Sequence, residues 1–299
     1  MTACASSSSD PVTDYPASVD ELTDDLQRGG YLADRGLATA LLVALSLHRP
    51  VLLEGEVGVG KTEVAKVLAG VYGRRLIRLQ CYEGIDTSQA LYEWDYARQM
   101  LAIRALSAHE AATEDSVDQL FGPKFLLERP LLAAVRAGAG AVLLIDEIDR
   151  ADDEFEAFLL EVLSDFQISI PEIGTVTAPS WPAVILTSNR TRELHDALRR
   201  RCLYHWIGYP SFDREVAIVS VRVPAAEPEL TRKVVQAVHR LREMDLAKPP
   251  GVAETIDWVR MLGFLGSHEL TADTLGAVIK DRDDLELVRE NLTEIASGA

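Results

Sequence analysis

The segment with the clearest chemistry is Gly55-Glu56-Val57-Gly58-Val59-Gly60-Lys61-Thr62. It matches the phosphate-binding P-loop pattern, and it lies between a segment expected to be a strand and one expected to be a helix. The glycines let the backbone wrap a phosphate closely, so that N–H groups and the helix N-terminus face the anion. We expect Lys61 to meet the β- and γ-phosphates of ATP, Thr62 to ligate Mg²⁺, and Glu63 to complete the nucleotide-binding segment. The alternative is a flexible turn between strand and helix.

A second group of residues that could take part in a reaction is the acidic pair Asp146 and Glu147, which follows the apolar run Val142 to Ile145. This run predicts a buried strand, and ligands of parallel sheets bind at the carboxyl ends of the strands. Phosphoryl transfer needs neutralised charge and a positioned nucleophile. We therefore expect Asp146 to belong to the Mg²⁺ shell and Glu147 to polarise the attacking water. Without the P-loop, such a pair is more typical of a solvated helix cap.

These groups need a parallel sheet to bring them together. Helical patterns separate the apolar runs, and alternating strands and helices predict a parallel sheet that is covered on both faces. A hairpin is predicted over Gln167 to Ala178. The strand signal stops after Pro210, so we expect a disordered tail at 1–18, an α/β nucleotide-binding domain at 19–209 and a helical domain at 210–299. The predicted strands are Val51–Leu53, Leu76–Leu79, Val142–Ile145, Ala183–Leu186 and Leu203–Ile207.

The composition limits the partners. The 299 residues are 47% apolar, which is enough for a large core and a smaller companion. A net charge of −17 repels nucleic acid and anionic lipid over most of the surface. The longest apolar stretch, Leu37 to Leu47, is shorter than the roughly 20 residues of a membrane span. Because the three cysteines lack paired spacing, a reducing, cytoplasmic compartment fits best.

Several segments together resemble a known family, the AAA+ ATPases, and within it the MoxR group and its CoxD-like branch. The resemblance extends from about Val19 to the C-terminus and implies the αβα sandwich of P-loop NTPases, with a five-stranded parallel sheet in the order 5-1-4-3-2, followed by a small all-helical lid. The segments that carry it are the P-loop, Leu144-Ile145-Asp146-Glu147-Ile148-Asp149, Leu186-Thr187-Ser188-Asn189, Ala197-Leu198-Arg199-Arg200-Arg201-Cys202, Tyr82-Glu83-Gly84-Ile85-Asp86 and Tyr92-Glu93-Trp94-Asp95-Tyr96.

The resemblance also implies roles for single residues. Asn189 matches sensor 1, whose amide can hold the attacking water or the γ-phosphate. Arg201 matches the arginine finger that reaches a neighbouring subunit's nucleotide, but Arg200 replaces the acidic residue usual before it, so either arginine can be the finger. The stretch Gly251 to Ile256 lacks the arginine of sensor 2, and Arg260 is the nearest substitute. The predicted hairpin resembles an insertion that projects toward a ring pore, with an ordinary surface hairpin as the alternative.

The expected function is a ring-forming motor or chaperone, a homo-oligomer and by resemblance a hexamer, that binds ATP and Mg²⁺ between subunits and remodels a partner. The resemblance implies a partner with a von Willebrand factor A domain and a client metalloenzyme, a molybdenum hydroxylase such as carbon monoxide dehydrogenase. A P-loop kinase acting on a small molecule is the alternative, although it has little use for Glu147 or for an arginine in trans. A non-hydrolysing switch is a third class, against which Glu147 and Asn189 argue.

Overall fold

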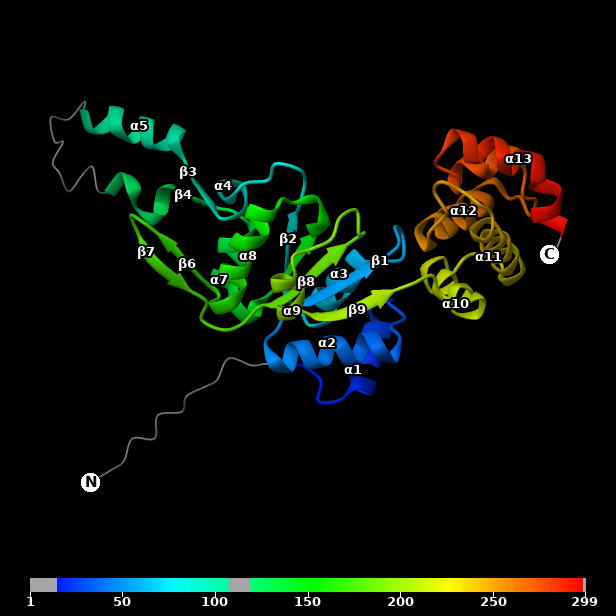
Figure 1. The fold of residues 1–299 in the computed structure, drawn as a ribbon, viewed down its shortest axis with the longest axis horizontal. Coiled ribbons are helices and arrows are strands. Elements are labelled where there is room, and N and C mark those ends of the chain that lie inside the picture. The colour runs from blue at the N-terminus through cyan, green and yellow to red at the C-terminus, as the bar shows by residue number, and fades with distance from the viewer. Residues whose placement is uncertain (1–14, 108–118, 298–299) are drawn as a thin grey trace, which may run out of the picture.

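The computed structural model describes residues 15–107 and 119–297, so most of the predicted tail lies outside the described residues (Figure 1). Its centre is a five-stranded parallel sheet in the order β2-β5-β8-β1-β9. Numbered along the chain, these strands have the predicted order 5-1-4-3-2, which is confirmed together with the P-loop α/β fold. The strands are β1 Val51–Gly55, β2 Arg75–Gln80, β5 Ala141–Asp146, β8 Ala183–Ser188 and β9 Leu203–Ile207.

Two hydrophobic layers cover the sheet because successive strand residues point to opposite faces. Leu53 and Leu144 pack in the layer that contains helices α1 to α3, whereas Leu52 and Leu143 pack in the layer that contains α7 to α9. This arrangement explains why the central strands are apolar throughout rather than alternating. The covering helices are α1 Val19–Arg28, α2 Arg35–Leu47, α3 Lys61–Val71, α7 Pro130–Ala137, α8 Asp153–Asp165 and α9 Asp196–Arg201.

Two short antiparallel ladders lie at the end of the molecule opposite the C-terminal helices (Figure 1). The predicted hairpin is confirmed, with β6 Gln167–Ile170 pairing with β7 Gly174–Thr177. The second ladder, β3 Tyr92–Trp94 with β4 Leu126–Glu128, was missed, because three-residue strands are too short to show a period of two. Among the described residues, this region also contains α4 Thr87–Ala90, α5 Tyr96–Ser107 and the 3₁₀ turns Gln119–Phe121 and Pro123–Phe125, and the 3₁₀ turns Gly138–Gly140 and Ile148–Arg150 flank β5.

The C-terminal region is helical, as predicted, and has a hydrophobic cluster of its own. Trp258 is fully buried in this cluster, and the buried carboxylate of Glu215 also connects the helices of the C-terminal region. Glu215 on the first helix accepts hydrogen bonds from Arg242 on the second (2.6 Å) and from Thr255 on the third (2.7 Å). The domain boundary at 209/210 stays a prediction. The helices are α10 Phe212–Arg222, α11 Pro228–Glu243, α12 Val252–Leu265, α13 Arg282–Ser297 and the 3₁₀ helix Ala272–Ala277.

None of the helices in the described ranges is long and apolar enough to cross a bilayer.

Two aromatic residues on α12 provide a test of the helical core. Trp258 is 0% exposed and Phe264 is 91% exposed. We expect Trp258→Ala to lower the free energy of unfolding by about 3–5 kcal/mol, because it leaves a large cavity. Phe264→Ala should change it by no more than about 0.5 kcal/mol. Urea unfolding of the full chain, followed by circular dichroism, measures both values, and equal effects would contradict the packing described for α12.

Candidate active site

The P-loop connects the buried strand β1 to the start of α3, and its glycines adopt conformations that other residues rarely take. Gly58 has φ 77° and Gly60 has φ 94°. A Cβ on Gly58 would lie only 3.0 Å from the Cα of Gly251, at the start of α12. This glycine is therefore required both by the loop conformation and by the close approach of the helical region.

Lys61 lies folded inside the loop. Its side chain is almost fully buried, and Nζ donates to the carbonyl oxygens of Gly55 (2.8 Å) and Glu56 (2.6 Å). Burial lowers the pKa of Lys61, and the charges of nearby carboxylates, Asp149 first among them, oppose this shift. A bound phosphate would favour the charged ammonium in the same way. The loop therefore presents a desolvated cation whose natural counter-ion is a phosphate.

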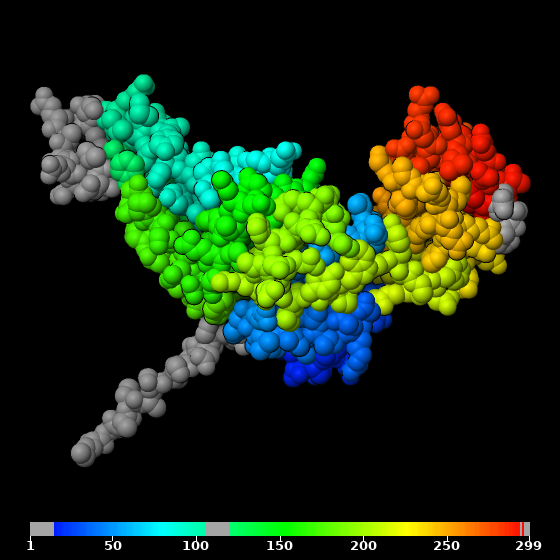
Figure 2. Space-filling model, viewed as in Figure 1, coloured from blue at the N-terminus to red at the C-terminus, as the bar shows by residue number. Residues whose placement is uncertain are grey.

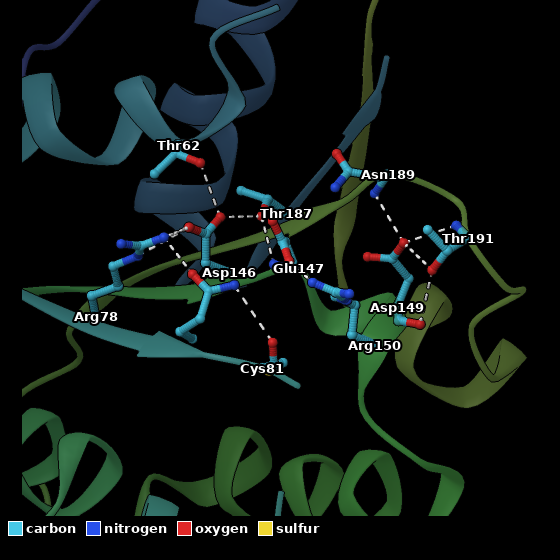
Figure 3. A network of polar contacts seen from close by, with 11 residues as sticks. Thr62, Arg78, Cys81, Asp146, Glu147, Asp149, Arg150, Thr187, Asn189 and Thr191 are labelled. Carbon is cyan, nitrogen blue, oxygen red and sulfur yellow. Dashed lines mark hydrogen bonds and ion pairs between the residues drawn. The ribbon is translucent and has the colours of Figure 1, made fainter. Parts of the chain in front are cut away.

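Asp146 lies at the carboxyl end of β5 and accepts hydrogen bonds from three directions (Figure 3). Its Oδ1 accepts from the hydroxyls of Thr62 (2.9 Å) and Thr187 (2.5 Å), and its Oδ2 accepts from Nε of Arg78 (3.0 Å). The two residues predicted to hold Mg²⁺, Thr62 and Asp146, are therefore in direct contact. Mg²⁺ takes few protein ligands and several phosphate or water oxygens, and this pair fits such a role.

Glu147 has a strained backbone that turns its side chain out of the strand direction. Its φ of 56° lies in the left-handed region, and its N–H donates to Thr187 Oγ1 (2.9 Å). The carboxylate is 3.2 Å from the Arg150 guanidinium, with a side chain about one third exposed. Asn189 follows β8, and both residues line the same cavity. A carboxylate and an amide thus face the space beside the P-loop.

This cavity has a volume of about 620 Å³, which suits a nucleotide. It lies between the α/β region and the helical region, because α10 and α12 supply part of its wall. Tyr31, from the segment before α2, lines it as well, and burial raises the pKa of its hydroxyl. The space-filling view shows a notch between the helical region and the rest of the molecule at the upper edge, and the two parts meet below it (Figure 2).

Two arginines of α10 were missed by sequence reasoning although they line the cavity. Arg222 Nη1 is 2.9 Å from Glu63 Oε1, and Arg214 Nη2 donates to the carbonyl oxygen of Leu32 (2.8 Å). With Ile218 between them they follow the i, i+4, i+8 spacing of one helix face, which was the available signal. Arg260, the predicted sensor 2 substitute, lies outside the lining and approaches Asp257 at 3.7 Å. Its Nη2 also lies 3.5 Å from the main-chain oxygen of Arg222, a residue that does line the cavity.

The arginine run forms α9, and no residue of α9 belongs to the described lining of the cavity. Arg199 Nη2 is 3.7 Å from the buried carboxylate of Glu54. Arg201 donates to the carbonyl oxygen of Leu160 (3.0 Å), whereas the Arg200 side chain is 82% exposed. Arg49 holds the end of the helix through the carbonyl oxygens of both residues. These arginines do not reach the chain's own cavity.

The sequence and this geometry agree with a known family. Residues 50–202 match the family described as AAA domain (dynein-related subfamily). The chain belongs to this family. It is therefore a nucleotide-binding AAA+ ATPase, and the small-molecule kinase is set aside.

Curated relatives cover much of the chain at low identity. The gas vesicle ATPase GvpN2 of Halobacterium salinarum is 26% identical over 269 residues, which are 84% of this chain and 74% of the relative. An uncharacterized protein of Staphylococcus epidermidis is 23% identical over 205 residues, which are 66% of this chain and 70% of the relative. Among solved structures, the RuvB Holliday junction branch migration motor of Thermotoga maritima has a TM-score of 0.44 at 18% identity, covering 91% of this chain and 72% of that one.

Lys61→Ala should abolish ATP binding, because it removes the buried cation that faces the phosphates. Lys66→Ala is the matched control, since Lys66 lines the same cavity but its side chain is 52% exposed. Exposed charge pairs contribute at most about 1 kcal/mol, so the control should bind with little loss. Calorimetric titration with ATP measures both. Parent-like affinity of Lys61→Ala would show that the nucleotide binds elsewhere.

Proposed function

We propose that this ATPase is Mg²⁺-dependent and binds ATP at the junction between subunits of a closed homo-oligomer, where hydrolysis drives the remodelling of a partner protein. The proposal rests on the observation that some of the expected site residues line one cavity of the chain whereas others lie outside it. The P-loop, Asp146, Glu147 and Asn189 surround one cavity, while the arginine helix α9 lies outside it. The chain's own cations at the cavity are on the P-loop, α3 and α10, and an arginine from α9 of a neighbouring chain would add to them where charge develops on the γ-phosphate.

Within one chain, the residues around the cavity divide the work of hydrolysis. Lys61 would neutralise phosphate charge, and the Thr62–Asp146 pair would hold a Mg²⁺ ion, which when bound would polarise the phosphate oxygens. Glu147 orients and polarises the attacking water as a general base. Asn189 contributes an amide that can donate to the γ-phosphate or accept from the water. Arg222 and Glu63 join the helical region to α3 in the wall of the cavity.

The finger in trans is Arg200 or Arg201. Exposure supports Arg200, whose guanidinium is directed into solvent and approaches only the exposed Asp196 at 3.6 Å among the described ion pairs. The Arg201 guanidinium is held by a carbonyl oxygen of α8 and would have to leave it to reach a neighbour. Since Arg49 fixes the end of α9, either residue starts from a rigid helix end.

The proposed action on a partner protein rests on the family resemblance. Likeness to the CoxD-like MoxR branch supports a chaperone that acts in the maturation of a molybdenum hydroxylase, with a von Willebrand factor A domain protein as helper and a hexamer as the working form. The Halobacterium relative is named a gas vesicle ATPase, which supports the ATPase activity and leaves the client a proposal from the resemblance alone. A cytoplasmic location is supported by the thiols of Cys81 and Cys202, which are buried and unpaired.

Glu147→Gln should retain ATP binding but lower turnover by about 10²- to 10⁴-fold, because the amide keeps the shape and removes the base. The variant should accumulate as an ATP-bound oligomer, visible by light scattering. Glu154→Gln is the control, since it makes the same chemical change at an exposed position on α8 and should turn over like the parent. Normal turnover of Glu147→Gln would assign the base to another carboxylate.

Mixing two inactive variants tests the shared site. Arg200→Ala should bind ATP but hydrolyse it about 10³-fold more slowly, because the finger is lost from the neighbour's site. In a mixed oligomer, its intact Glu147 meets the intact Arg200 of a Glu147→Gln subunit, so phosphate release should rise and peak at intermediate mixing ratios. Arg201→Ala is mixed in the same way for comparison. Background rates with both arginine variants, despite demonstrated subunit exchange, would exclude Arg200 and Arg201 as the finger.

A further inference from the structure

Asp149 is a buried acid that the steps above do not use. It lies in the 3₁₀ turn Ile148–Arg150, which begins directly after Glu147. Only 2% of its surface is exposed, so its charge has lost nearly all contact with water. Burying an ionised carboxylate costs free energy unless hydrogen bonds or opposite charges compensate. Its partners therefore indicate what this acid holds in place.

All the hydrogen bonds described for the Asp149 carboxylate come from the segment that follows β8 (Figure 3). Oδ2 accepts from the N–H of Asn189 (3.2 Å), from the N–H of Thr191 (2.8 Å) and from Thr191 Oγ1 (2.7 Å). The Thr191 hydroxyl also lies 3.2 Å from the main-chain oxygen of Asp149. The carboxylate thus binds both ends of the short segment Asn189 to Thr191.

This segment depends on such support because its backbone is strained. Arg190, its middle residue, has φ 58°, in the left-handed region that non-glycine residues rarely adopt. A single further hydrogen bond to the segment is described, from the Arg190 N–H to Ser188 Oγ (3.0 Å). A strained backbone persists only where surrounding groups hold it, and two N–H donors converging on one oxygen do so here.

The other oxygen of Asp149 has a different environment. Oδ1 is buried and has no hydrogen-bond partner among the described residues. In Figure 3 it points away from the Asn189–Thr191 segment, on the side of Glu147 and Thr187. An acid that served the segment as a passive cap would gain nothing from an unpaired buried oxygen. The negative charge of Asp149 also favours the charged form of Lys61. Among the carboxylates that raise the pKa of Lys61 against the effect of burial, Asp149 has the largest influence.

We propose that Asp149 is a positioning residue that sets the place of the Asn189 amide relative to Glu147. One buried carboxylate joins the turn that carries Glu147 to the segment that carries Asn189, so the distance between the two groups depends on it. This inference rests on the proposed role of Asn189 in hydrolysis. Asp149 itself touches neither nucleotide nor water in this role, and it acts on turnover through Asn189.

The experiment is a double-mutant cycle on the full chain, with turnover and ATP affinity measured separately. Asp149→Ala should lower kcat by roughly 10- to 100-fold, as removal of outer-shell partners does in other sites, with a smaller loss for Asp149→Asn, whose amide oxygen still accepts. Thr191→Val removes the hydrogen bond from the Thr191 hydroxyl to the Asp149 carboxylate without changing any charge. It therefore separates the positioning of Asn189 from the effect of the Asp149 charge on Lys61. It should lower kcat by a few-fold at unchanged ATP affinity. Asp153→Asn, exposed on α8, is the matched control and should resemble the parent.

The decisive comparison uses Asn189→Ala as the background. If Asp149 and Thr191 act through Asn189, then their substitutions lower kcat in the parent but have no further effect when Asn189 is already alanine. Losses of equal size in both backgrounds would overturn the inference and assign Asp149 a separate role. Parent-like kcat of Asn189→Ala would instead overturn the proposed role of Asn189, and with it this inference. If Asp149→Ala is unfolded by circular dichroism, the Thr191→Val cycle decides alone.

Discussion

The arrangement of this site depends on the hydrogen bonds that the Asp146 carboxylate accepts. It ends β5, and it accepts from Thr62 at the start of α3 and from Thr187 in β8. Arg78 in β2 also donates to it, so one side chain joins the three neighbouring strands β2, β5 and β8 and, through Thr62, the start of α3. Asp146 can do this because a carboxylate offers two acceptor oxygens, and carboxylate oxygens are also ligands that Mg²⁺ takes in proteins.

The helical region meets this edge through small residues rather than through a large apolar surface. The N–H of Ala253 donates to the carbonyl oxygen of Gly58 (3.2 Å), and a Cβ on Gly251 would lie 2.7 Å from the Cα of Gly58. The Arg222–Glu63 ion pair adds a second contact at the side of the cavity. The junction of the two regions therefore shares residues with the P-loop and with the wall of the cavity.

Local patterns predicted the parts of the site that lie within one segment. The P-loop and the acidic pair each occupy adjacent positions on a strand end, so residue type and spacing were sufficient. The strand order, by contrast, came from the family resemblance, because periodicity says nothing about which strands pair. The contacts of Asp149 and Arg222 were out of reach for the same reason: each partner lies 40 or more residues away, and only the fold brings it close.

A site divided in this way also determines how subunits must meet. If the cavity of one chain takes an arginine from α9 of the next, then two different surfaces are in contact, and the interface is head-to-tail rather than two-fold symmetric. Repeating such a contact closes into a ring when the rotation between subunits divides a full turn, and every member then both receives and donates a cation. In such a ring, a change on α9 would leave the chain's own cavity intact and alter the neighbour's, so that α9 would connect one nucleotide site with the next.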